Sequence, residues 1–141
     1  MEVKDGARDA GPAVEVSSLI KRYGELVAVD GLSLKIPRGQ VLGLLGPNGS
    51  GKTTTISCIL QLLTYDKGSI RVFGEPMTPT AYGLKRRIGV VPQEVAVFDE
   101  LTVAENVDAF CALYVRDRAE RRHLVAEAIA FVGLEKFVKF K

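Results

Sequence analysis

The sequence predicts an α/β fold, and three features of the chain support this. Short apolar segments alternate with turn residues before residue 39, as they do in an antiparallel sheet. The continuous apolar run Val41–Leu45 then leads through a glycine-rich loop into a helical pattern, which is typical of a buried strand followed by a helix. From Val103 to about Phe131 the pattern becomes helical and charged.

The expected elements follow from apolar periodicity and turn residues, taken in chain order. Short N-terminal strands are expected at 14–16, 26–29 and 32–36. Buried or returning strands are expected at Val41–Leu45, Ser69–Phe73 and Ile88–Val91. A helix is expected over Thr53–Leu63, with one apolar face made of Ile56, Ile59, Leu60 and Leu63. Arg116–Arg122 is expected to be a solvated break in the C-terminal helical part.

Composition limits the classes of protein to consider. With 141 residues, 47% hydrophobic and 26% charged, we expect one folded domain over 13–141 after a flexible tail at 1–12. The net charge of +2 argues against a nucleic-acid partner. No apolar run approaches the length of a membrane-spanning helix. Cys58 and Cys111 lie among apolar neighbours without metal-ligand spacing, so both are expected to be core residues.

One motif carries chemistry. Residues 46–53 read Gly-Pro-Asn-Gly-Ser-Gly-Lys-Thr and fit the P-loop pattern G-x-x-x-x-G-K-[ST] at every fixed position. Glycines let successive backbone N–H groups turn inward around a phosphate. Lys52 is expected to reach the β and γ phosphates, and Thr53 to bind Mg²⁺. The nucleotide-binding residues predicted here are Gly46, Pro47, Asn48, Gly49, Ser50, Gly51, Lys52, Thr53 and Thr54.

The residues around the motif narrow the class of P-loop protein. The segments 21–24, 29–34, 39–46, 53–55, 68–74, 88–94 and 101–107 resemble the ATP-binding domain of ABC transporters, in the family's order. The resemblance runs from about Val14 to the end of the chain and is greatest for prokaryotic export-type subunits. It implies a P-loop NTPase fold of ABC ATPase type, here incomplete, with an N-terminal antiparallel β portion.

The resemblance also implies roles beyond the loop. Tyr23 matches the aromatic residue that stacks on adenine, and Gln93 matches the Q-loop residue that touches Mg²⁺ or the attacking water. Lys52 and Gln93 would then be the catalytic residues, with ATP and Mg²⁺ as cofactors. Family members pair with a second ATP-binding subunit, identical or different, and with transmembrane permease subunits at the cytoplasmic face of the membrane.

Several family motifs do not occur in this sequence, namely LSGGQ, a Walker B strand with its catalytic Glu, and the switch His. The run Val95–Phe98 followed by Asp99 and Glu100 imitates Walker B, but it follows Gln93 without room for a crossover. His123 beside two arginines is expected to be a surface residue. We therefore expect this chain alone to bind ATP without hydrolysing it. A non-catalytic nucleotide-binding module and another P-loop NTPase remain the alternatives.

The resemblance has a further consequence for stability. In the family, two strands lie between those that match Val41–Leu45 and Ile88–Val91, so both segments are expected to lack a neighbour. The sequence also does not predict how the helix at Ala112–Val115 is capped, because the family usually has Gly where Val115 stands. We expect the chain alone to be marginally stable.

Overall fold

A computed structural model describes residues 11–93 and 97–141 of the chain, and these fall into two compact units. One unit extends to Gly89 and the other begins at Val90. Each unit is described by itself. The expected tail, residues 1–12, lies almost wholly outside the described residues.

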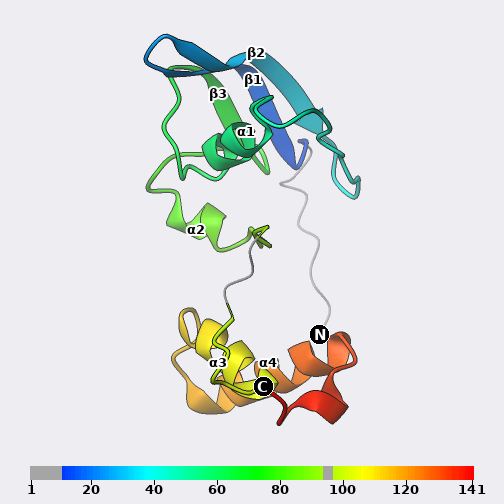
Figure 1. Ribbon diagram of the computed structural model, residues 1–141. Helices are drawn as coiled ribbons and strands as arrows, with labels where there is room; N and C mark the ends of the chain where they lie inside the picture. Colours follow the sequence, from blue (N-terminus) through cyan, green and yellow to red (C-terminus); the bar gives the residue numbers. More distant parts are fainter. Residues whose placement is uncertain (1–10, 94–96) are drawn as a thin grey trace. The chain divides into compact units, whose positions relative to one another are not determined.

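The first unit is built on an antiparallel sheet (Figure 1). Its strands are β1 (Val14–Tyr23), β2 (Leu26–Ile36), β3 (Lys67–Val72) and β4 (Glu75–Pro76), in the order β2-β1-β3-β4. β1 pairs with β2 through a tight hairpin in which Tyr23 lies opposite Leu26. The predicted antiparallel β portion is confirmed, and the two short strands expected at 26–29 and 32–36 are one continuous strand.

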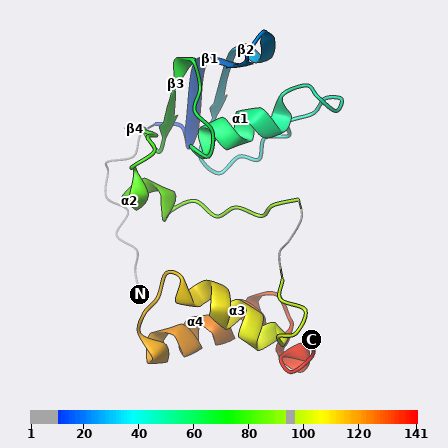
Figure 2. The same cartoon turned by 60° about the vertical axis from the view of Figure 1, so that its left-hand side comes forward.

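Helix α1 (Lys52–Ile59) packs against this sheet, as Figure 2 shows. Its Cys58 is fully buried among Val16, Leu19 and Ile70, which confirms the expectation of a core cysteine. The predicted helix was too long, because the chain leaves helical geometry at Gln61, where φ is 54°. The predicted apolar face was also partly wrong. Ile56 is exposed, and the buried positions of α1 are Thr55 and Cys58.

A short helix that the sequence did not predict, α2 (Tyr82–Lys85), follows β4. Leu84 of α2 and Met77 just after β4 are buried in the core of the first unit. This single turn of helix thus extends the apolar core beyond the sheet.

Two predicted strands are not formed. Residues 41–45 and 88–91 have irregular backbone and pair with no described strand. Val41 and Leu45 are almost completely exposed, as is Val91. An apolar run becomes a strand only when a partner supplies hydrogen bonds to its backbone, and none of the described segments does so here. The absence of a paired strand among the described residues agrees with the expectation that both segments lack a neighbour.

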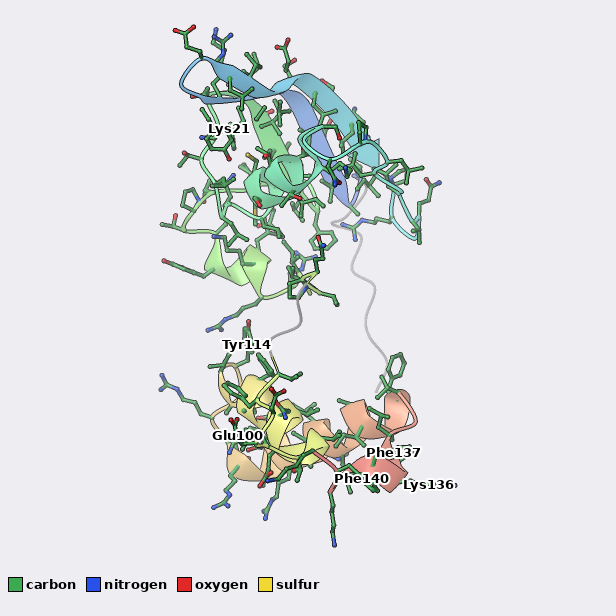
Figure 3. All side chains as sticks on the ribbon, viewed as in Figure 1. Lys21, Glu100, Tyr114, Lys136, Phe137 and Phe140 are labelled. Atoms are coloured by element: carbon green, nitrogen blue, oxygen red, sulfur yellow. The ribbon has the colours of Figure 1, made fainter. Side chains whose placement is uncertain are left out.

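The second unit is a pair of helices, α3 (Val103–Ala112) and α4 (Arg118–Phe131), followed by the 3₁₀ turn η1 (Glu135–Phe137). Val125 and Ile129 of α4 form its buried apolar positions. The chain after η1 returns to the start of α3, where Val103 N–H donates to the Phe140 carbonyl at 2.8 Å. Phe137 and Phe140, labelled in Figure 3, meet edge to face with ring centroids 5.6 Å apart.

The break between α3 and α4 lies at 113–117, earlier than predicted. Asp117 caps α4 by accepting from Glu120 N–H at 2.7 Å, so Arg118–Arg122 continues as helix. α3 ends in right-handed geometry at Leu113, without the left-handed residue that a Gly would supply. His123 is exposed and pairs with Glu127, which confirms that it is a surface residue. Residues 97–100 form no strand, and residues 95 and 96 lie outside the described residues.

Candidate functional site

The loop at 46–51 joins the irregular segment before it to α1 and turns sharply at its glycines. Gly49 and Gly51 have φ angles of 83° and 82°, in the left-handed region that favours glycine. Ser50 N–H donates to the Pro47 carbonyl at 3.3 Å and closes a turn within the loop. The sequence therefore folds locally into the curled backbone that a phosphate cradle needs.

Lys52 folds back over this loop. Its ammonium nitrogen Nζ donates to the carbonyls of Gly46 and Pro47, both at 2.7 Å, and lies 3.5 Å from Ser50 Oγ. The only positive charge of residues 46–53 is thus held against the first residues of the loop. Carbonyl oxygens are weaker partners for an ammonium group than phosphate oxygens, so an anion in the loop can take over this contact.

The start of α1 offers donors to the same anion. The N-cap Gly51 has no side chain, and Thr55 N–H is the first that donates within the helix, to the Gly51 carbonyl at 2.8 Å. The N–H groups of Lys52, Thr53 and Thr54 precede it and have no carbonyl one turn earlier in α1. Together with the positive end of the helix dipole, this geometry favours bound phosphate.

A pocket of about 370 Å³ lies between the loop, α1 and strand β2. Lys52, Ser50 and Thr55 line it on one side, and Ala28 and Asp30 of β2 line it on the other. Sequence analysis missed the residues of β2. Asp30 lies sixteen positions before the motif, and no local pattern indicates that β2 passes beneath the loop.

The two predicted residues outside the loop belong to other segments of the chain. Tyr23 ends β1 at the hairpin and is 47% exposed, and it does not line the pocket beside the loop. Gln93 is exposed and belongs to the second unit. Thr53 and Thr54 are in the first turn of α1, with the Thr53 side chain exposed. The roles predicted for these residues stay predictions.

The sequence model of the family described as ABC transporter matches residues 29–141, which is most of the chain. The chain belongs to the ABC transporter family. The resemblance inferred from the sequence is therefore confirmed, and so is the α/β fold of ABC ATPase type.

Curated ABC transporter proteins are similar to most of this chain. It is 38% identical over 128 residues to the linearmycin resistance ATP-binding protein LnrL of Bacillus subtilis, covering 91% of the chain and 41% of the relative. It is 40% identical over 125 residues to the Nod factor export ATP-binding protein I of Ralstonia nicotianae, covering 89% and 39%. It is 43% identical over 122 residues to the daunorubicin/doxorubicin resistance ATP-binding protein DrrA of Streptomyces peucetius, covering 86% and 37%.

Solved ABC transporter subunits have the same fold. An ATP-binding subunit of an ABC transporter superposes with a TM-score of 0.71 at 25% identity, over 90% of this chain and 53% of that one. The subunit cbiO1 of Clostridium perfringens, part of the complex cbiONQ, gives 0.77 at 24% identity, over 92% and 54%. The chain spans about two fifths of the length of the curated relatives. No helix in the described ranges is both long and apolar enough to cross a bilayer.

Proposed function

We propose that this chain is the nucleotide-binding part of an ABC transporter ATPase, and that it holds MgATP in the loop at 46–54. The observation that carries the proposal is the convergence on one small space of the curled loop, the Lys52 ammonium and the uncapped start of α1. Three independent sources of positive potential at one point suit a polyphosphate. A turn that only joined two segments of the chain would not need them.

Each residue has a role in this proposal. The backbone N–H groups of Gly49, Gly51 and Lys52 would surround the β phosphate, and those of Thr53 and Thr54 would face the neighbouring oxygens. Lys52 Nζ would leave the carbonyls of Gly46 and Pro47 and bind oxygens of the β and γ phosphates. Pro47, Asn48 and Ser50 complete the wall of the loop. Lys52 would also offset the charge that develops during phosphoryl transfer.

Magnesium fits the donors present at this site. Thr53 places a hydroxyl oxygen, a hard ligand that Mg²⁺ prefers, in the exposed first turn of α1. The carboxamide oxygen of Gln93 is the second ligand that we propose. When bound, the metal would draw charge from the phosphate oxygens.

The wider setting is also a proposal. The relatives above carry names that refer to ATP binding, to export and to drug resistance, and cbiO1 is described as part of a transporter complex. We infer that this chain works beside transmembrane permease subunits and a second ATP-binding subunit, at the cytoplasmic face of the membrane. ATP hydrolysis would then power transport by the assembled protein.

The test is MgATP affinity, measured by isothermal titration calorimetry for the wild type and for Lys52→Ala. Loss of a charge-assisted contact of about 1.5–3 kcal/mol should raise Kd by roughly tenfold to 150-fold. Lys67→Ala is the matched control, because Lys67 is an exposed lysine of β3 in the same unit. Equal affinities for the wild type and Lys52→Ala would refute the proposed site.

A single-turnover assay with the same proteins separates binding from catalysis. If MgATP binds and no phosphate is released, even with a twofold excess of protein over ATP, the chain supplies binding alone. If phosphate is released, and Lys52→Ala abolishes this release, the residues of this chain suffice for hydrolysis.

A further inference from the structure

Lys21 and Tyr23 lie two residues apart near the end of β1, and their side chains meet. The Lys21 ammonium nitrogen is over the Tyr23 ring, 5.0 Å from its centroid. This is within the range of a cation–π interaction, in which the negative face of the ring attracts the cation. Figure 3 labels Lys21 beside the strands of the first unit. One face of the ring is therefore in use within the protein itself.

The Lys21 cation lies near the core of the first unit. Lys21 is only partly exposed, whereas Tyr23 is 47% exposed. Burial raises the pKa of the Cys58 thiol, and the Lys21 ammonium opposes this effect, so its charge lies near a fully buried residue of α1. From these observations we infer that the exposed part of the ring is the part away from Lys21.

The backbone under this pair is held firmly. Asp66 Oδ2 accepts from Arg22 N–H at 2.7 Å, and Asp66 N–H donates to the Ile20 carbonyl at 2.8 Å. These two bonds fix the strand on either side of Lys21. A ring on a fixed strand, with its inner face against a cation, has few orientations available.

We propose that Lys21 is a positioning residue for the nucleotide base: it holds the Tyr23 ring so that the outer face stacks on a purine. This inference rests on the proposed function, and also on the adenine-stacking role that the family resemblance implies for Tyr23. Offset stacking of flat rings suits a purine, which covers more of the ring than a pyrimidine does. Lys21 itself does not contact the base.

The expected effect follows from the population of the competent orientation. An exposed cation–π contact changes that population by about twofold to fivefold, and the apparent Kd rises by the same factor when the contact is lost. Lys21→Met keeps the length and apolar stem of the side chain and removes the charge. Lys21→Arg keeps the cation.

The experiment measures the affinity of the protein for MgATP and for magnesium tripolyphosphate, which has no base, by calorimetry. We expect Lys21→Met to weaken MgATP binding by about twofold to fivefold and to leave tripolyphosphate binding unchanged. Lys21→Arg should restore the MgATP affinity. In a Tyr23→Ala background, Lys21→Met should have no further effect, because the ring that it positions is absent.

Five results would overturn the inference, and they separate its failure from that of the proposed function. If the wild type binds neither probe, the proposed function fails and the inference fails with it. If Tyr23→Ala leaves MgATP affinity unchanged, Tyr23 is not the platform. If Tyr23→Ala weakens MgATP binding but Lys21→Met leaves it unchanged, Lys21 is neutral, and the inference alone fails. If Lys21→Met tightens MgATP binding, Lys21 blocks the base, and again the inference alone fails. Equal losses for both probes in Lys21→Met would indicate a general structural defect.

Discussion

Replacement of Gly51 by alanine should destabilise the first unit much more than the same change at Gly49. The two glycines have nearly equal φ angles, 82° and 83°, so alanine suffers the same backbone strain at both. Their surroundings differ. A Cβ at Gly51 would lie 2.3 Å from the Ala28 carbonyl oxygen of β2, whereas a Cβ at Gly49 would meet nothing within 4 Å.

The magnitudes follow from these two terms. Left-handed geometry costs a residue other than glycine about 1–2 kcal/mol, which is the whole cost expected for Gly49→Ala. At Gly51 the loop must also move away from a backbone atom, and overpacking of this kind costs about 1–3 kcal/mol more. We therefore expect Gly51→Ala to lose about 2–5 kcal/mol in free energy of unfolding.

The assay is native-state hydrogen exchange of the β1 amides, because β1 is one of the two inner strands of the sheet and reports unfolding of the first unit. Gly49→Ala is the control for the strain common to both positions. Equal loss of protection in the two variants would refute the reasoning, since it would mean that the loop does not lie against β2.

Two predictions concern the second unit. The Asn106 side chain accepts from Phe98 N–H at 2.8 Å and donates to the carbonyls of Phe98, Leu101 and Thr102. The substitution Asn106→Asp removes these donors and turns a carboxylate toward the carbonyls. It should therefore lower the free energy of unfolding by about 1–3 kcal/mol. Exchange of the α3 amides measures this, and protection equal to that of the wild type would contradict it. The backbone N–H and the hydroxyl of Thr102 donate to Glu105 and lower the pKa of its carboxyl. The Glu105 carboxylate therefore stabilises the fold at pH values above the pKa of this carboxyl in the unfolded chain. This contribution is lost as pH falls through the lower pKa of the folded protein. Urea unfolding over about pH 3–6 should show a weaker pH dependence for Glu105→Gln, and identical slopes would exclude this role.

The features that the sequence predicted well depend on neighbouring residues. The loop at 46–53 turns at its own glycines, and α1 begins where the motif places a helix. The capping box of α3 was not predicted, although its signal is equally local, since Thr102 and Glu105 bond to each other. Such signals lie within a few residues and need no distant partner.

The features that the sequence predicted poorly depend on distant segments. Val41–Leu45 has the composition of a buried strand, yet composition cannot supply the neighbour that a strand requires. Asp30 enters the pocket only because β2 passes the loop, and Asn106 matters only because the chain at Phe98 folds back over α3. Pairing of this kind is a property of the whole fold.

The close approach of Gly51 to Ala28 also connects the two halves of the proposed nucleotide site. The phosphate loop lies against β2 at Ala28, and β2 pairs with β1, where Val29 lies opposite Lys21 and Leu26 lies opposite Tyr23. The loop and the proposed base platform are thus attached to the same hairpin, only a few residues apart along β2. The distance from phosphate to base in the proposed site would therefore be set by this hairpin before any nucleotide arrives. A displacement of the loop by Gly51→Ala should therefore weaken the binding of MgATP more than the binding of magnesium tripolyphosphate, since only MgATP must reach both ends of the proposed site at once.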